Sequence, residues 1–190
     1  GPGIKNKIGT SLGSHIYDKS KYFLNCKKSN TFIENIFSDT YSPLKSMQQI
    51  ISQISQKQIS TAFENKMAYS DCIIRIHNDG DSVHLHRDNC NFEMPDYIVS
   101  KYKNQLSAIL YLQSPEHGGE LTVYQKQWNR YDERSRQPDF GYSFDLVNGT
   151  SYTSISPTAG SMVLLNPNFY HKVESVHGNS SRVSIGFFFA

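Results

Sequence analysis

The feature of this sequence that most restricts its fold is the alternation of short apolar runs and turn residues after residue 70. Many of these runs have the length and composition of β-strands, and no long helical pattern separates them. They comprise residues 71–78, 82–87, 105–113, 119–125, 141–147, 151–156, 161–166, 170–176 and 182–189. About eight strands in this arrangement are typical of a sandwich or barrel, and eight is the number in a jelly roll. We therefore predict a mainly β fold, a jelly roll or double-stranded β-helix.

The preceding part of the chain has a different pattern. Residues 4–42 are polar and mixed, and their pattern assigns no element. A helix is indicated from Ser42, a suitable N-cap followed by a proline, to about Asn65. Its apolar residues recur at helical spacing: Leu44, Met47, Ile50, Ile51 and Ile54. We expect an amphipathic helix against the sheet, so that residues 4–69 form an N-terminal helical buttress and residues 70–190 the jelly-roll core of a single domain.

Length, charge and cysteine content narrow the class of protein. The 190 residues fit one compact domain. The net charge of +2 comes from scattered Lys and Arg residues, so we expect no nucleic-acid partner. No apolar run has the length of a membrane span, so we expect no membrane partner. Cys26, Cys72 and Cys90 form no CxxC motif, which predicts reduced cysteines and a cytoplasmic location, while nothing indicates an oligomeric state.

The segment Val83–Asp88, VHLHRD, contains three possible metal ligands at alternate positions: His84, His86 and Asp88. Alternate residues of a strand share a face, so all three could point the same way. His171, which opens a predicted strand after a turn, offers a distant ligand. Two imidazoles and one carboxylate are the facial triad typical of non-haem Fe(II) oxygenases, which leaves three metal positions open for chemistry.

His84 and His86 also resemble the HxH motif of cupins, another jelly-roll family. Cupins carry a glutamate a few residues later and then a P-x-G-x-x-H motif. Here the next glutamate is Glu93, and Gly160 is followed by Ser161 and Met162. This departure weakens the cupin interpretation.

Three ordered motifs of the chain resemble the 2-oxoglutarate and Fe(II)-dependent oxygenases, specifically their prolyl-4-hydroxylase-like branch. In the first, Gly80 precedes the H-x-D of His86 and Asp88 by six residues. The second is LSAILYLQSPEHGGELTVY, with Leu106, Tyr111, Leu112, Gly118, Gly119 and Glu120 in the family's places. The third is PTAGSMVLLNPNFYHKVESVHGNSSRVSIGFFF, which contains His171 and Arg182. The resemblance covers about residues 70–190.

The resemblance implies that His86, Asp88 and His171 bind Fe(II) and that Arg182 anchors the co-substrate 2-oxoglutarate. The guanidinium fork of arginine matches a carboxylate in a bidentate manner, which suits this task. Ser184 is two residues from Arg182 on the predicted strand and can add a hydroxyl donor, and Tyr111 is a third candidate donor.

The implied reaction consumes O2 and 2-oxoglutarate, releases succinate and CO2, and hydroxylates an unactivated C–H bond, with ascorbate as reductant. Halogenases related to this family replace the carboxylate ligand with a small residue, which admits chloride. Asp88 occupies that place here, so hydroxylation is favoured over halogenation. Desaturation and cyclisation stay open.

The motif GGELTVYQKQW and the charged residues after it look like those of small-molecule hydroxylases and halogenases that act on free amino acids. Residues 126–140 have the length of a lid or binding loop. Candidate substrate contacts are His84, Tyr124, Trp128, Arg130 and Arg134. One alternative is a peptidyl prolyl hydroxylase. An alternative of another class is a jelly-roll module that binds a ligand without catalysis.

Overall fold

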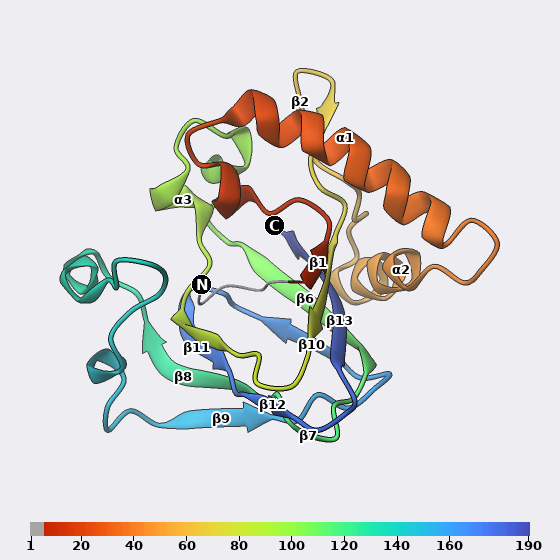
Figure 1. Ribbon diagram of the computed structural model, residues 1–190. Coiled ribbons are helices and arrows are strands. Elements are labelled where there is room, and N and C mark those ends of the chain that lie inside the picture. The colour runs from red at the N-terminus through yellow and green to blue at the C-terminus, as the bar shows by residue number, and fades with distance from the viewer. Residues whose placement is uncertain (1–5) are drawn as a thin grey trace.

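The computed structural model describes residues 6–190 and contains two antiparallel sheets that face each other (Figure 1). The five-stranded sheet has the order β1 (Asn6–Ile8), β4 (Ile73–His77), β13 (Arg182–Phe189), β6 (Leu106–Gln113) and β10 (Met162–Leu165). The four-stranded sheet has the order β5 (Val83–His86), β11 (Phe169–Val173), β8 (Leu121–Gln127) and β9 (Tyr152–Ile155). This arrangement is the predicted jelly roll.

Two short pairs complete the strands. β7 (His117–Gly118) pairs with β12 (Val176–His177), and β2 (Phe63–Glu64) pairs with β3 (Met67–Ala68). Between the two large sheets lies an apolar core of Val83, Leu121, Leu165 and Val173, with Ile109, Val123, Ile155 and Val163 packed around it. The β-branched and leucine side chains of the apolar runs thus fill the space between the two sheets.

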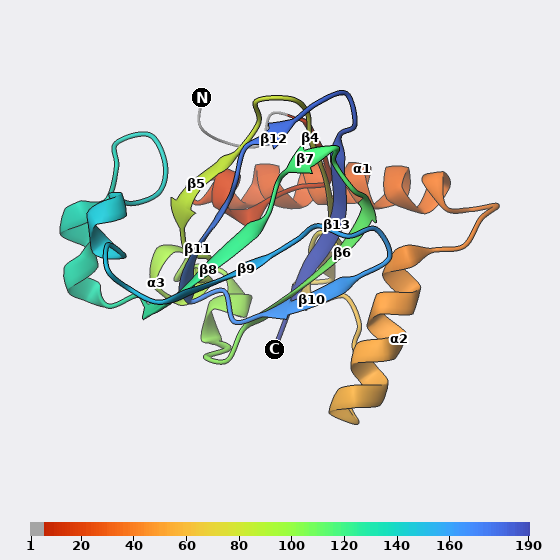
Figure 2. The ribbon, with the colours of Figure 1, turned by 90° about the horizontal axis from the view of Figure 1, so that it is seen from below.

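Two helices cover the outer face of the five-stranded sheet (Figure 2). They are α1 (Lys19–Ile36) and α2 (Pro43–Ser55). Met47 and Ile51 of α2 pack with Ile33 of α1 against Ile74 and Ile185 of the sheet. The predicted amphipathic helix against a sheet is therefore present, with Ser42 accepting a hydrogen bond from the Lys45 amide as its N-cap.

Helix α2 ends earlier than predicted, and α1 was not predicted. Gln56 adopts a left-handed conformation with φ of 56°, which ends α2 at Ser55 instead of about Asn65. The four residues after Ile54 are polar and interrupt the apolar spacing. The pattern of α1 is obscured because its inward face includes Asn30, whose buried amide bonds the Tyr69 carbonyl and the Asp71 N–H.

The remaining elements are short helices of one or two turns. They are α3 (Cys90–Glu93) and the 3₁₀ turns η1 (Leu12–His15), η2 (Ile98–Lys101), η3 (Arg130–Ser135) and η4 (Phe144–Leu146). The strand predicted at residues 141–147 is wrong, because η4 occupies this range. Tyr142 and Val147, the apolar residues that flank η4, pack instead against Leu85 and Tyr170 on the outer face of the four-stranded sheet.

The N-terminal segment contributes to the same structure as the rest of the chain. Strand β1 pairs with β4 at the edge of the five-stranded sheet. Tyr22 and Phe23 of α1 form an aromatic cluster with Tyr69 and Tyr97. Cys26, Cys72 and Cys90 are free and buried. Among the described residues, no helix has the length and apolar composition that would let it cross a membrane.

Candidate functional site

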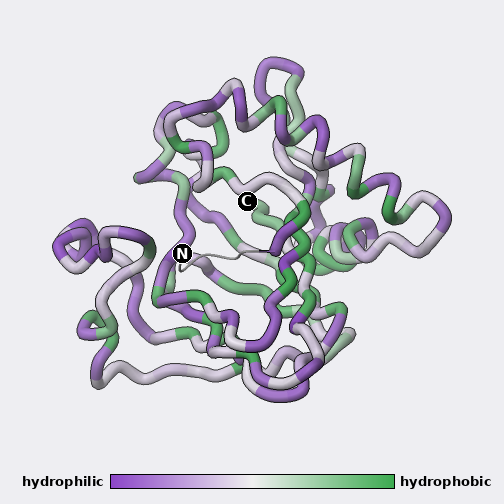
Figure 3. The backbone as a smooth tube through the Cα atoms, viewed as in Figure 1, coloured by the Kyte–Doolittle hydropathy of each residue, from purple (hydrophilic) through white to green (hydrophobic). Residues whose placement is uncertain are grey.

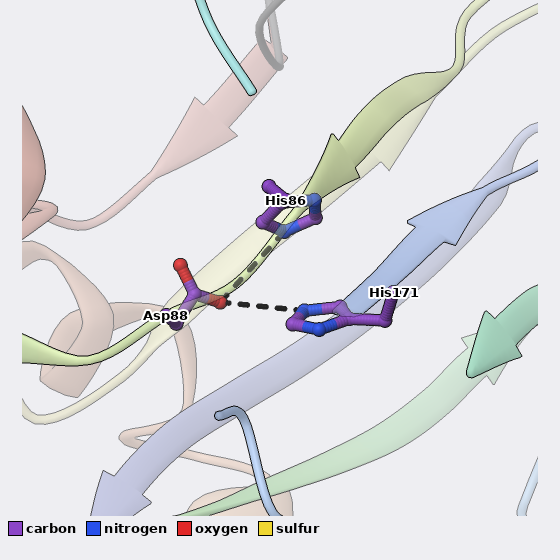
Figure 4. Close-up of side chains that lie close together, drawn as sticks. All are labelled: His86, Asp88 and His171. Carbon is purple, nitrogen blue, oxygen red and sulfur yellow. Dashed lines mark ion pairs between the residues drawn. The ribbon is translucent and has the colours of Figure 1, made fainter. Parts of the chain in front are cut away.

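Three predicted ligands lie together at one end of the jelly roll (Figure 4). His86 on β5 pairs directly with His171 on the neighbouring β11, and Asp88 follows the end of β5. One ligand atom from each residue lies within 4.8 Å of the other two. An Asp88 oxygen is 3.8 Å from His86 Nε2 and 3.5 Å from His171 Nε2. This cluster is compact enough for the three side chains to bind one metal ion.

Main-chain contacts fix the orientation of both rings. His86 Nδ1 lies 2.7 Å from the His84 carbonyl oxygen, and His171 Nδ1 lies 2.8 Å from the Phe169 carbonyl oxygen. A carbonyl only accepts, so each Nδ1 carries the proton and each Nε2 presents a lone pair toward Asp88. Histidine ligands of metals are typically held in this way by a hydrogen bond from the other ring nitrogen.

The protonation states also suit metal binding. Burial, with a smaller contribution from His171, lowers the pKa of His86 to about 4. Burial alone would raise the pKa of Asp88, but His171, His86 and Arg75 outweigh it and hold this pKa below its usual value. At neutral pH the site therefore offers a neutral imidazole and an ionised carboxylate, the forms that bind a metal. The Asp88 amide donates to the Pro167 carbonyl at 2.9 Å, which ties the carboxylate to the loop before β11.

His84 is exposed and lies outside this cluster. The register between β5 and β11 passes from His86↔His171 to Val83↔Val173, so β5 has one residue more than its partner at this point. This bulge places Val83 in the inner core and removes His84 from the face of His86. Simple alternation predicted a shared face, and the bulge corrects it.

The predicted anchor residues share the inner face of the five-stranded sheet. Arg182 and Ser184 lie on β13, and Tyr111 on β6 pairs with Ser184. All three are buried, and the Arg182 guanidinium lies 4.9 Å from the centre of the Tyr111 ring and 3.5 Å from Ser184 Oγ. His77 on β4, which sequence reasoning missed, pairs with Arg182 and places Nδ1 3.3 Å from its Nη1.

Three of these four residues have buried polar atoms without a hydrogen-bond partner among the described residues. Arginine only donates, so His77 Nδ1 accepts and His77 Nε2 carries the proton. Within residues 6–190, His77 Nε2, Tyr111 Oη and Arg182 Nε are buried and have no hydrogen-bond partner, and no carboxylate pairs with Arg182. Buried polar groups normally have partners, and a buried guanidinium normally has an anion. The donor set therefore fits a bound carboxylate such as that of 2-oxoglutarate.

The long loop after β8 covers the outer face of the four-stranded sheet and is mostly hydrophilic (Figure 3). Val123 pairs with His171, so both residues are on the inner side of the sheet. Tyr124 follows Val123 along β8 and therefore faces the outer side, as Thr122 does. Tyr124 borders a hollow of about 810 Å³ on that outer surface, away from His171. Arg130 and Arg134 are exposed, and Arg134 lies over Tyr131. The structure does not bring these three residues to the candidate site.

Trp128 packs on a buried arginine instead of lining an open pocket. The Arg87 guanidinium lies 4.1 Å from the Trp128 ring, and Trp128 Nε1 donates to Glu133 at 2.6 Å. Arg87 stands between His86 and Asp88 in the sequence but points to the outer side, where it pairs with Glu93 and Glu133 at 3.6 and 3.5 Å. The middle residue of the H-x-D motif thus attaches the long loop to the strand that carries the candidate ligands.

One loop residue does reach the site, and sequence reasoning missed it. The ring of Phe140 lies 5.3 Å from that of His86. The chain then turns at Gly141, with φ of +83°, and Tyr142 donates to the Leu85 carbonyl at 2.8 Å. A side chain on Gly141 would collide with this carbonyl. The sequence signal that could have identified Phe140 was a glycine directly after an aromatic residue in the predicted lid.

Comparison with known proteins identifies the family. A family model described as carrier-protein-independent halogenase WelO5 matches residues 3–190. The chain belongs to this family. Membership confirms the resemblance to small-molecule oxygenases and halogenases that use 2-oxoglutarate and Fe(II).

Two curated relatives of this WelO5 family member act in or are named for small-molecule biosynthesis. Leucinostatins biosynthesis cluster protein S of Purpureocillium lilacinum is 28% identical over 185 residues, which is 93% of this chain and 74% of that protein. The L-gamma-glutamyl-L-propargylglycine hydroxylase of Streptantibioticus cattleyicolor is 30% identical over 117 residues, 61% of this chain and 42% of the hydroxylase. The chain therefore matches less than half of the latter protein.

The fold has a counterpart among solved structures. An N-substituted L-amino acid dioxygenase from Burkholderia ambifaria AMMD, also solved in complex with alpha-KG, aligns with a TM-score of 0.63 and 13% identity. The alignment covers 94% of this chain and 68% of the dioxygenase. At this identity the similarity shows the jelly-roll fold.

Proposed function

We propose that this chain is an Fe(II)- and 2-oxoglutarate-dependent hydroxylase that acts on a small amino acid derivative. The observation that carries the proposal is the compact group of two Nε2 lone pairs and one carboxylate at His86, His171 and Asp88. These three residues would hold Fe(II) on one side and leave its other positions accessible.

The buried donors of the five-stranded sheet complete the proposed site. Arg182, with Ser184, Tyr111 and His77, would bind the distal carboxylate of 2-oxoglutarate. The keto acid end of the molecule would then remain available to bind Fe(II). With both groups bound, the site supplies the oxidising chemistry: O2 is consumed, 2-oxoglutarate becomes succinate and CO2, and a substrate C–H becomes C–OH.

Other groups of the chain orient the site and limit access of water. The backbone carbonyls of His84 and Phe169 hold the two imidazoles, and Phe140 covers the His86 ring on the side of the loop. Asp88 is the most open of the three, with 42% of its side chain exposed. Substrate would therefore approach past Asp88, between the two sheets.

Asp88 favours hydroxylation although the family is described as a halogenase family. A carboxylate at this position occupies the place that a chloride would need. We predict that the enzyme forms only hydroxylated product in buffer with saturating chloride. Mass spectrometry of the products checks this, and a chlorinated product from the unmodified chain would contradict it.

The substrate class is supported by the named relatives. One is a hydroxylase of a γ-glutamyl amino acid, and a protein of the same fold is a dioxygenase of N-substituted amino acids. We therefore propose an amino acid or its N-substituted derivative as substrate, with ascorbate as the reductant that keeps iron in the Fe(II) state. The cytoplasm is the proposed location.

The direct test measures conversion of 2-oxoglutarate to succinate with Fe(II), ascorbate and a panel of free, N-acylated and γ-glutamylated amino acids. At least one member should stimulate turnover above the uncoupled background. If no member does so and 2-oxoglutarate itself does not bind, the proposal fails.

Iron titration of single variants tests the ligand assignment. His86→Ala and His171→Ala should each weaken iron binding by more than about 100-fold, because a ligand is lost outright. His84→Ala is the matched control from the same strand and should bind iron as the unmodified chain does. Equal loss of iron in His84→Ala and His86→Ala would contradict the assignment.

A further inference from the structure

A second interior arginine, Arg75, lies beside the candidate site and was not part of the predicted set. It is on β4, where it pairs with Ser184 of β13. Residues that pair directly in an antiparallel sheet have their side chains on the same face. Arg75 therefore shares the inner face with Arg182, Ser184, Tyr111 and His77.

Arg75 occupies a different row of this face from Arg182. Arg182 pairs with His77, Ser184 pairs with Arg75, and Gly186 pairs with Ile73. A Cβ added at Gly186 would lie 3.4 Å from Arg75 Nη1, so the guanidinium extends over Gly186, on the side away from Arg182. Two separate cationic positions thus follow one another along the sheet.

Arg75 faces the sheet that carries the candidate metal ligands. Val123, which pairs with His171, packs in the same core as Ile109, and Ile109 pairs with Gly186 beneath the Arg75 guanidinium. Arg75 lowers the pKa values of Asp88 and His86, and Asp88 in turn opposes the lowering of the Arg75 pKa that burial causes. Within residues 6–190, Arg75 nevertheless makes no hydrogen bond and no ion pair at contact distance. The residue is half-buried, so the guanidinium is free to bind an anion that enters between the sheets.

The charge balance of the site indicates which bound molecule could supply an anion for Arg75. Fe(II) and Arg182 together balance Asp88 and the two carboxylates of 2-oxoglutarate. Arg75 adds one positive charge that this set leaves uncompensated. We propose that Arg75 binds the carboxylate of the substrate, which makes it a specificity-determining residue for amino acids and derivatives with a free carboxylate. This inference rests on the function proposed above.

The neighbouring cation on the same row is already engaged. Lys7 of β1 pairs with Arg75 across the strands, but its Nζ lies 3.4 Å from Ser11 Oγ and 3.3 Å from Ser14 Oγ. The planar guanidinium of Arg75 also matches a carboxylate in bidentate fashion, which an ammonium does not. Lys7 therefore provides a matched control for the loss of one positive charge at this edge.

The experiment is calorimetric titration without O2, using protein loaded with Fe(II) and 2-oxoglutarate. The probes are the amino acids and derivatives of the panel, each paired with its primary carboxamide, which removes only the negative charge. The unmodified chain should bind at least one acid and bind its amide at least about tenfold more weakly. Arg75→Met should weaken binding of the acid by about 10- to 100-fold and leave the amide within about twofold.

Separate readouts distinguish this inference from the proposed function. Binding of 2-oxoglutarate should change by less than about twofold in Arg75→Met but by more than about tenfold in Arg182→Met. Lys7→Met should retain the preference for acid over amide. Three results would overturn the role of Arg75: no acid binds, an amide binds as tightly as its acid, or Arg75→Met weakens 2-oxoglutarate as Arg182→Met does. Failure of the unmodified chain to bind 2-oxoglutarate would instead overturn the proposed function.

Discussion

His77 and Arg182 lie side by side in the interior, 3.3 Å apart at their closest nitrogens, and no carboxylate among residues 6–190 pairs with either side chain. Burial, Arg182 and Arg75 together lower the pKa of His77 from 6.5 to about 4. The ring is therefore neutral at neutral pH and can accept a hydrogen bond from Arg182. A protonated His77 would place two unpaired positive charges in contact.

This arrangement predicts a pH dependence of stability. The folded-state pKa of His77 is below the unfolded value, so the unfolded chain binds more protons between about pH 6.5 and pH 4. The stabilisation is complete above pH 6.5 and is lost as the pH falls toward 4, by up to about 1.4 kcal/mol per pH unit. His77→Gln, which cannot titrate, should show a shallower loss.

Urea unfolding at pH 7, 6 and 5 measures this difference. The free energy of unfolding of the unmodified chain should fall more steeply with pH than that of His77→Gln. The exposed His117→Gln serves as control and should follow the unmodified chain. Parallel pH profiles for the unmodified chain and His77→Gln would contradict a neutral buried His77.

At this scale, the sequence predicted the residues that belong to spaced motifs. His86, Asp88 and His171 were found because H-x-D and the later histidine follow a known order, and the structure brings them together. His77 and Arg75 belong to no motif, although two polar residues alternate with isoleucines in IIRIH, which indicates a polar inner face. His84 was misplaced because no sequence pattern announced the bulge in β5.

Among the elements, the loop between β8 and β9 is attached to the chain segment that carries His86 and Asp88. Glu133 accepts from Trp128 Nε1 and Tyr142 Oη, each at 2.6 Å, and pairs with Arg87 and Arg136 at 3.5 and 3.3 Å. The Arg87 side chain is fully buried, so it depends on Glu133 and Glu93 for neutralisation. The loop is thus held as a fixed cover instead of an open lid.

Glu133→Gln should lower the free energy of unfolding by about 2–3 kcal/mol, because it removes a charge from a partly buried network and leaves Arg87 underpaired. It should also increase proteolysis within residues 129–142. Asp139→Asn, in the same loop and exposed, should change stability by less than about 0.5 kcal/mol. Equal effects of the two variants would show that the network does not hold the loop.

Helices and strands could be predicted from the sequence where the spacing of their apolar residues matches the period of the helix or strand. The strands of the two sheets other than β1, and the core of α2, follow their period. Tyr142 and Val147 instead form an apolar run that packs from an irregular loop. The helix α1 lacked a readable face because a hydrogen-bonded Asn30 replaces an apolar residue in it. In each failure, tertiary contacts outweighed the local pattern.

Across the whole molecule, the helices and the sheets share their cores. Ile33, Met47 and Ile51 pack with Ile74 and Ile185, so the division into a buttress and a jelly-roll core does not separate two hydrophobic cores. The single tryptophan of the chain, Trp128, lies on the other side of the molecule, beyond the four-stranded sheet. Its fluorescence therefore reports on a region that packs against α3 and is separate from the core that contains α2.

If the chain unfolds as one cooperative unit, a destabilising substitution in α2 should also lower the unfolding midpoint measured at Trp128. Ile51 is 2% exposed, and Ile51→Ala should lower the free energy of unfolding by about 2–4 kcal/mol through the lost packing. Ile54 on the same helix is 69% exposed, and Ile54→Ala should change it by less than about 0.5 kcal/mol. Urea unfolding is followed by far-ultraviolet circular dichroism and by Trp128 fluorescence. In Ile51→Ala both signals should shift to the same lower midpoint, since the five-stranded sheet links the helices to the four-stranded sheet that carries the candidate ligands. A fluorescence midpoint that stays at its original value while the dichroism shifts would mean that the helices unfold independently of the site.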